Sequence, residues 1–257
     1  MKNRLLKCTG LIIGLVFVFA LFPQSTATVI WDDDFNGGTI APEWIVKDGD
    51  WTAIDNYLRA DNIVAEEECV IWRNCTQTVG TWSIDVYHGT DDEYFKTTVL
   101  FFANGTEVDD FFGYGIRLLG DIVYLVKQLG GFTTISLLGS ATTEGLEDSW
   151  TSFDVTRNST GGIHVYINAT SYSEEPDIIA VDHDFDTSER FVIQARVDVS
   201  GEYFDNIIID DELPDSTTST PTSPTTNGEL DSTLLLMLGA GVGGAVIIAA
   251  VVYMRRR

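Results

Sequence analysis

Positive charge is scarce in this sequence. The 257 residues include 15 Lys and Arg against 39 Asp and Glu, which gives a formal net charge of −24 at pH 7. A nucleic-acid-binding domain needs clustered cations to contact phosphates. The composition therefore excludes nucleic acid as a partner, and it also disfavours other polyanionic ligands.

Histidine and the common catalytic motifs are equally sparse. His88, His164 and His183 are scattered over separate segments without the paired spacing of zinc ligands. The sequence has no glycine-rich phosphate loop and no Gly-x-Ser-x-Gly motif. These absences argue against a zinc site, a nucleotide site and a serine hydrolase.

Cysteine is rare, and its arrangement leaves the redox state open. Cys69 and Cys75 are the only cysteines after the N-terminal segment. Extended chain would separate them by about 20 Å, whereas a disulfide tolerates roughly 7 Å between Cα atoms. They form a disulfide only if this segment folds back, although an oxidising exterior would favour a bridge over free thiols.

The apolar residues are concentrated at the two ends of the chain. A basic start, an uninterrupted apolar run over residues 11–22 and the small residues at 25–27 predict a signal peptide over residues 1–27. An uncleaved membrane helix is the weaker alternative, because a membrane span needs about 20 apolar residues.

The C-terminal apolar segment is long enough to cross a membrane. Residues 234–253 carry no charge and are followed by a basic tail at 254–257. Positive charge stays on the cytoplasmic side, so we predict a single-pass type I protein of the cell membrane with most of the chain outside. Gly239 and Gly243 form a GxxxG pair that would allow a homodimer, although small residues are also common in membrane helices that do not associate.

A polar spacer separates this helix from the rest of the exterior chain. Residues 212–233 are rich in Thr, Ser and Pro, which is typical of a glycosylated stalk. Residues 28–211 remain as one domain of about 180 residues, which is ample for a single core. N-glycosylation sequons predict sugar attachment in an exported chain at Asn74, Asn104, Asn158 and Asn168.

The domain at 28–211 has almost no helical periodicity. Short runs of β-branched and aromatic residues recur between Gly, Asn and Asp turn signals, and Trp82, Ile84 and Val86 alternate with more polar neighbours. Fourteen strands without helices predict an all-β, two-sheet sandwich. The predicted strands are 29–32, 44–47, 51–54, 57–60, 69–73, 81–88, 94–103, 111–118, 122–128, 133–138, 150–157, 163–168, 191–198 and 203–210.

Several segments at both ends of this domain resemble a known family. DDFN at 33–36, PEW at 42–44, DGDW at 48–51 and NYLR at 56–59 resemble the opening of concanavalin A-like lectin/glucanase (laminin-G-like) jelly rolls. YFDNI at 203–207 resembles their last strand, which lies beside the first. The resemblance implies a jelly-roll sandwich of two curved sheets that commonly binds glycans on its concave face, and some members are glycoside hydrolases.

The resemblance also implies a place for a metal ion. Related jelly rolls often hold a structural Ca²⁺ between the first and last strands, and the matching positions are Asp34 and Asp205. The alternative is that both are solvated acids at strand ends. The alternating acids at 182–186 do not form an EF-hand, because the glycine and glutamate of that loop are missing.

Binding and catalysis make different demands on a sheet face. A glycan site needs aromatic rings with nearby polar groups, for which the candidates are Tyr87, Tyr94, Tyr114 and Arg117. The alternative is that these aromatics belong to the core. A retaining glycosidase needs two carboxyls about 5–5.5 Å apart. No strand carries the expected pair of acids on one face, so we expect no catalysis.

The sequence therefore predicts a membrane-anchored, lectin-like protein of the cell surface whose task is binding or adhesion. Its partner would be a glycan or another surface protein. The alternatives are an extracellular glycoside hydrolase of polysaccharides and a structural envelope protein without a ligand.

Overall fold

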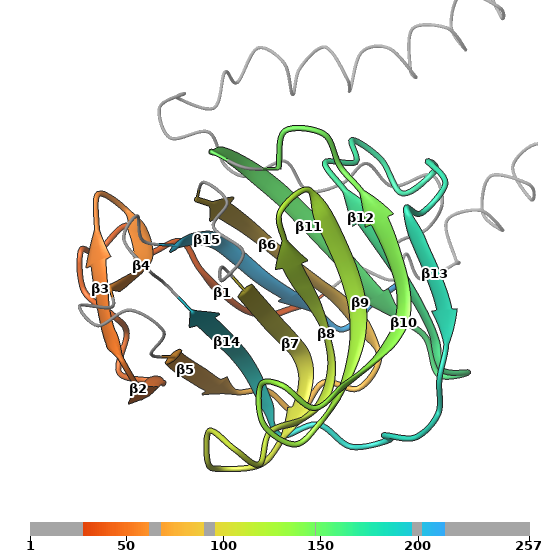
Figure 1. Ribbon diagram of the computed structural model, residues 1–257, viewed down its shortest axis with the longest axis horizontal. Helices are drawn as coiled ribbons and strands as arrows, with labels where there is room; N and C mark the ends of the chain where they lie inside the picture. Colours follow the sequence, from red (N-terminus) through yellow and green to blue (C-terminus); the bar gives the residue numbers. More distant parts are fainter. Residues whose placement is uncertain (1–27, 62–67, 90–95, 147, 197–201, 214–257) are drawn as a thin grey trace, which may run out of the picture. The chain divides into compact units, whose positions relative to one another are not determined.

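Two antiparallel β-sheets stack into a sandwich in the computed structural model (Figure 1). The structure describes residues 28–61, 68–89, 96–146, 148–196 and 202–213, all within the first of two compact units, residues 1–220. The predicted signal peptide, nearly all of the stalk, the predicted membrane helix with Gly239 and Gly243, and the basic tail lie outside these residues. In the described part of the chain, no helix is long and apolar enough to span a membrane.

The larger sheet has eight strands. The first strand, β1 (Val29–Asp33), pairs with the last strand, β15 (Glu202–Asp210), and Asp33 lies opposite Ile207, as the family resemblance implies. The remaining strands follow the order β13 (Ile178–Val181), β12 (Gly162–Ile167), β11 (Ser149–Arg157), β6 (Gly80–His88), β15 (Glu202–Asp210), β4 (Tyr57–Asp61) and β3 (Asp50–Ile54).

The smaller sheet has seven strands and faces the first (Figure 1). Its order is β10 (Ile135–Thr142), β9 (Ile122–Leu129), β8 (Phe112–Leu119), β7 (Lys96–Asn104), β14 (Arg190–Arg196), β5 (Glu68–Asn74) and β2 (Trp44–Asp48). The predicted all-β sandwich is confirmed.

One strand of the sandwich was missed by the sequence prediction. β13 has four residues and pairs only with β12 among the described strands. Ile179 and Val181 on this edge are 58% and 66% exposed. The strand is too short for alternation to identify it, and it follows an acidic segment that reads as a loop.

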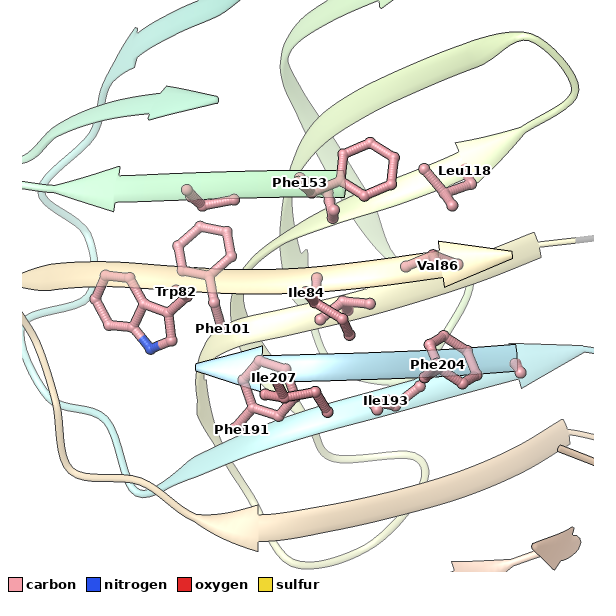
Figure 2. Close-up of a cluster of buried hydrophobic side chains, with 14 of the residues drawn as sticks. Trp82, Ile84, Val86, Phe101, Leu118, Phe153, Phe191, Ile193, Phe204 and Ile207 are labelled. Atoms are coloured by element: carbon pink, nitrogen blue, oxygen red, sulfur yellow. The ribbon is translucent and has the colours of Figure 1, made fainter. Parts of the chain in front are cut away.

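Alternating side chains from both sheets fill the space between them. Trp82, Ile84 and Val86 of β6 point inward, as their spacing predicts, while the residues between them point outward. The Trp82 ring lies 5.4 Å from that of Phe101 on the opposite sheet. Figure 2 shows such side chains meeting in one layer, and burying each large side chain contributes about 1.5–3 kcal/mol.

A second, smaller apolar cluster covers part of the outer face of the seven-stranded sheet. Val70 and Trp72 of β5 point away from the main core and pack with Leu100 and Val192. Phe111, from the connection between β7 and β8, is fully buried against them. This sheet therefore has apolar packing on both faces.

Of the two states that the sequence left open for Cys69 and Cys75, the structure has the free thiols. Both cysteines are buried free thiols, one on β5 and one directly after it. The strand is extended, so the segment does not fold back to bring the sulfur atoms together. Burial raises the pKa of the Cys69 thiol to about 11, which keeps it protonated and unreactive.

The four sequon asparagines have different environments. Asn74 and Asn168 are exposed, and Asn158 is half-buried. Asn104 is 7% exposed, and its Nδ2 donates a hydrogen bond of 2.6 Å to the carbonyl of Thr187. A glycan at Asn104 would be attached to that same nitrogen, and glycosylation at all four positions stays a prediction.

One carboxyl on the outer face of the eight-stranded sheet is almost completely buried. Asp154 of β11 is 6% exposed and accepts a 2.5 Å hydrogen bond from Ser83 Oγ. Burial, with a smaller contribution from Asp85, raises the pKa of Asp154 to about 6. Because this pKa lies above the ordinary value, the protonated form is favoured by folding.

We predict that Asp154→Asn makes stability less dependent on pH. The contribution of the protonated carboxyl is complete below its ordinary pKa of 3.8 and is lost as the pH rises through about 6. At pH 7.5 the variant should therefore be more stable by about 1–3 kcal/mol, and below pH 4 the difference should vanish. Urea unfolding of the purified protein across this pH range measures it.

The matched control is Asp121→Asn, which removes an exposed carboxylate from the turn between β8 and β9. It should leave the pH profile of the free energy of unfolding unchanged. Parallel profiles for the parent protein and Asp154→Asn would contradict the assignment.

Candidate functional site

A pocket of about 380 Å³ lies on the outer face of the eight-stranded sheet. It is found where β6 ends and β15 begins. Four of its lining residues are aromatic and three are charged. We call it the aromatic pocket, and its lining residues are Ile54, Asp55, Tyr57, Arg59, Tyr87, Asp148, Trp150 and Tyr203.

Strand register brings most of these side chains together. Tyr87 of β6 lies directly opposite Tyr203 of β15 on one side and Trp150 of β11 on the other. Arg59 of β4 lies opposite Tyr203 in turn. One row across four neighbouring strands therefore supplies half of the pocket, since residues in register share a face.

The four aromatic rings form a closed circle of contacts. Tyr57 lies 5.0 Å from Trp150 and 6.2 Å from Tyr203, measured between ring centroids. Tyr87 lies 5.8 Å from Trp150 and 5.5 Å from Tyr203. Each ring thus contacts two others, and Trp150 remains 40% exposed. These distances fall within the range of favourable aromatic pairs, which hold the rings in place.

A tight turn delivers two of the lining residues. Asp55 and Asn56 join β3 to β4 with φ values of 52° and 69°. Two consecutive left-handed residues are typical of a type I′ hairpin turn, for which Asp and Asn are suited. The turn places Asp55 and Tyr57 at the edge of the aromatic pocket.

The connection before β11 supplies the second carboxylate. Asp148 has a φ of 54°, and its N–H donates a hydrogen bond of 2.8 Å to the carbonyl of His88. This bond ties Asp148 to the end of β6. Burial and the charge of Asp148 raise the pKa of Tyr87, so its phenol stays protonated.

The pocket has an excess of negative charge. Among the described residues, Arg59 is the only lining cation, and its guanidinium forms an ion pair of 2.7 Å with Asp61. The same guanidinium lies 5.6 Å from the ring centroid of Tyr203. The charge of Arg59 is therefore balanced by Asp61, and the carboxylates of Asp55 and Asp148 remain as the net charge of the lining.

A buried contact between a histidine and a glutamate lies behind the pocket. His88 Nδ1 is 3.1 Å from Glu202 Oε1, and both side chains are completely buried. These residues follow Tyr87 and precede Tyr203, respectively, and point to the opposite face of the sheet. This contact between two buried side chains joins the end of β6 to the start of β15.

The sequence candidates for ligand binding are not gathered in one place. Tyr87 lines the aromatic pocket, and Tyr94 lies outside the described residues. Tyr114 is fully buried and donates a hydrogen bond to Asp182. Arg117 is buried on the outer face of the seven-stranded sheet, where its Nε donates a hydrogen bond of 2.8 Å to Thr98. Tyr114 and Arg117 are therefore structural in their contacts.

Three aromatic residues of the pocket were missed. Tyr57 and Tyr203 stand within the segments that carry the family resemblance, and Trp150 begins a predicted strand. Trp150 lies three and five positions before the buried Phe153 and Val155. Because successive side chains of a strand point to opposite faces, alternation predicts that Trp150 points outward. Its proximity to Tyr57 was not readable, because two other strands lie between β11 and β4.

A group of acids lies beside the pocket on the same face. Asp205 is directly opposite Asp85. Each lies two residues along its strand from a pocket tyrosine, Tyr203 and Tyr87 respectively. The carboxylate of Asp85 accepts hydrogen bonds from Ser152 at 2.5 Å and Asn206 at 2.7 Å. Burial, and then repulsion by Asp85 and other acids, raises the pKa of Asp205 to about 6.

The predicted calcium positions are near each other but do not form a complete site. The charge of Asp34 contributes to the raised pKa of Asp205, so the two carboxyls interact. Asp34 is exposed and already accepts hydrogen bonds from the backbone and side-chain amides of Asn36. Within the described ranges, no three His, Cys, Asp or Glu side chains are arranged to hold a metal ion. Ca²⁺ takes about six to eight oxygen ligands, which include backbone carbonyls and water, and structural calcium at Asp34 and Asp205 stays a prediction.

Comparisons with known proteins identify the fold. No family model and no curated protein matches the chain. Among solved structures, a carbohydrate-binding module, CBM66 from Bacillus subtilis, matches with a TM-score of 0.51 and 14% identity, covering 66% of this chain and 94% of that one. The laminarinase catalytic domain from Thermotoga maritima matches with a TM-score of 0.53 and 11% identity, covering 74% of this chain and 100% of the other.

A lectin domain belongs to the same group of neighbours. The exoplasmic/lumenal domain of VIP36, solved in a Ca²⁺/Man3GlcNAc-bound form, matches with a TM-score of 0.52 and 15% identity, covering 72% of this chain and 88% of that one. At such low identities the likeness is one of fold. The described domain therefore has the galectin-like or concanavalin A-like jelly-roll fold that carbohydrate-binding modules, lectins and glycoside hydrolases share.

Proposed function

We propose that this protein binds glycans in the aromatic pocket. The observation that carries the proposal is the closed circle of Tyr57, Trp150, Tyr87 and Tyr203 on a solvent-facing sheet surface. Aromatic faces pack against the apolar faces of sugar rings, while nearby polar groups orient the hydroxyls. Asp55, Asp148 and Arg59 supply such groups at the edge of the pocket.

The fold supports this proposal independently of the pocket. Its structural neighbours include a carbohydrate-binding module and a lectin domain solved with Man3GlcNAc. The pocket volume of about 380 Å³ is within the usual range for small-ligand sites, so it would hold one or two sugar units.

We further propose that the domain is displayed at the cell surface. The support comes from the sequence, namely the predicted signal peptide at 1–27 and the predicted membrane helix at 234–253. Display on a stalk would let the pocket reach glycans carried by another cell or surface protein. Association through Gly239 and Gly243 stays a prediction of the same kind.

A second candidate function is glycoside hydrolysis. The observation that favours it is the direct opposition of Asp85 and Asp205, because opposite residues on neighbouring strands have Cβ atoms about 4.5–5.5 Å apart. This spacing is close to the carboxyl separation of retaining glycosidases. Asp205 with its raised pKa would serve as the acid, and Asp85, held by Ser152 and Asn206, as the nucleophile.

Removing one aromatic ring tests whether glycans bind in the aromatic pocket or elsewhere on the surface. We expect Trp150→Ala to weaken glycan binding by about tenfold or more, because a partly exposed ring in a binding site contributes more than 1 kcal/mol. A glycan array identifies ligands, and calorimetry with the best one gives the affinity. The matched control is Phe112→Ala on β8, whose ring is 37% exposed and lies in the other sheet.

Two outcomes would contradict this proposal. Equal losses for Trp150→Ala and Phe112→Ala would show that the aromatic pocket is not the binding site. An array without any ligand would favour a structural envelope protein.

Hydrolysis is tested by incubation of the purified protein with β-glucans at pH 5–7. If glycan binding is the whole function, we expect no release of reducing sugar. If the second candidate is correct, release is expected, and Asp205→Asn should lower it by at least 10²-fold because proton transfer to the leaving group is lost. Asp121→Asn, far from Asp205 in sequence and in the other sheet, should retain the parent activity.

Cell-surface display is tested by protease treatment of intact cells that produce the full chain. Cleavage of the domain without lysis is expected if it is exposed outside. Protection of the domain in intact cells, with cleavage only after lysis, would overturn the proposed topology.

A further inference from the structure

We propose that the aromatic pocket selects glycans that carry a protonated amine, such as 2-amino-2-deoxy sugars without an N-acetyl group. The inference rests on the proposed function, because it concerns the same pocket. It adds the chemical class of the ligand, which glycan binding alone leaves open.

The first argument is the charge balance of the lining. The carboxylates of Asp55 and Asp148 lie on the turn before β4 and on the connection before β11, respectively, and both residues are exposed at the edge of the pocket. Arg59, the one cation that lines the pocket in the described part of the chain, is paired with Asp61 at 2.7 Å. A neutral sugar would leave both carboxylates without a counter-charge, whereas an ammonium group would balance one of them.

The second argument is the arrangement of the rings. Neighbouring centroids around the circle of four are separated by 5.0–6.2 Å. A cation that rests on one ring is therefore within reach of the next, since favourable cation–π contacts extend to about 6 Å from a centroid. Arg59 already makes this contact with Tyr203 at 5.6 Å, which shows that the rings accept a cation.

The third argument concerns the charge state of Tyr87. The Tyr87 phenol is kept protonated by burial and by Asp148, which raise its pKa. It is neutral at physiological pH and its ring keeps the negative face that attracts cations. The rings and the two carboxylates thus favour the same kind of ligand, and both disfavour a uronic acid or a sulfated sugar.

The experiment compares four 1,4-linked tetrasaccharides at pH 6, three of them β-linked and the galacturonate tetramer α-linked. They are the glucosamine tetramer, its fully N-acetylated counterpart, the glucose tetramer and the galacturonate tetramer. We expect the glucosamine tetramer to bind about tenfold more tightly than the two neutral ones, as for an added charge-assisted contact. The galacturonate tetramer should bind most weakly.

The variant Asp55→Asn/Asp148→Asn should reduce the tenfold preference to less than about threefold, because it removes the attracting charge. The readout is the ratio of the affinities for the glucosamine tetramer and its N-acetylated counterpart, because Asp55 and Asp148 also contact the hydroxyls of a neutral glycan in the proposed site and both affinities can change. Asparagine tolerates the left-handed backbone of both positions, so the fold should persist, which the melting temperature checks. The matched control is Glu175→Gln, which removes an exposed carboxylate from the connection between β12 and β13.

The possible outcomes distinguish failure of the amine preference from failure of glycan binding itself. If the neutral tetramers bind as tightly as the glucosamine tetramer, the amine preference is overturned and glycan binding stands. If no tetramer binds but other glycans on the array do, the amine preference alone is overturned. If no glycan binds, the proposed function itself fails.

Two further results would also overturn the inference. An equal loss of preference in Glu175→Gln would mean that the overall negative charge, not the pocket, attracts the amine. Competition by tetramethylammonium at concentrations equal to those of the glucosamine tetramer would mean that the pocket recognises a bare organic cation and not a sugar.

Discussion

The inward packing of β6, β11 and β15 is the constraint on which the site depends. Trp82, Ile84 and Val86 must face the core, so every second residue of β6 must face outward. A slip of one residue would exchange Tyr87 for one of its buried neighbours and would remove it from the pocket. The position of the aromatic rings is therefore secured by the hydrophobic core, and the buried contact between His88 and Glu202 joins the end of β6 to the start of β15.

The site lies largely on regular strands, although two of its charges come from connections. Tyr87, Trp150 and Tyr203 are set by register, whereas Asp55 and Asp148 adopt left-handed backbone conformations outside the strands. Side chains on strands are held more rigidly than those on connections, so the rings form a fixed surface. The two carboxylates, in contrast, are positioned by the backbone of the connections.

Sequence alone gave the sandwich, because the alternation of β6 and the turn signals are local properties. It also gave the face of Tyr87, since parity assigns each strand residue to one side. It could not show that β15 lies between β4 and β6, or that Trp150 reaches Tyr57, because such neighbours are distant in sequence. Alternation along the strand likewise could not show that the inward-facing Tyr114 is fully buried, because the burial of a side chain depends on the elements that pack against it.

The shortage of cations in the sequence has a counterpart in the structure. Only nine of the Lys and Arg residues lie between residues 28 and 233, and five of them stack on aromatic rings: Arg59, Arg73, Arg117, Arg157 and Arg190. Lys47 and Lys127 are paired with nearby carboxylates. Most of the available positive charge is thus used to hold strands and connections together. Among the described lining residues of the aromatic pocket, two carboxylates therefore face a single, already paired cation, and this imbalance is the basis of the proposed preference for a ligand with its own positive charge.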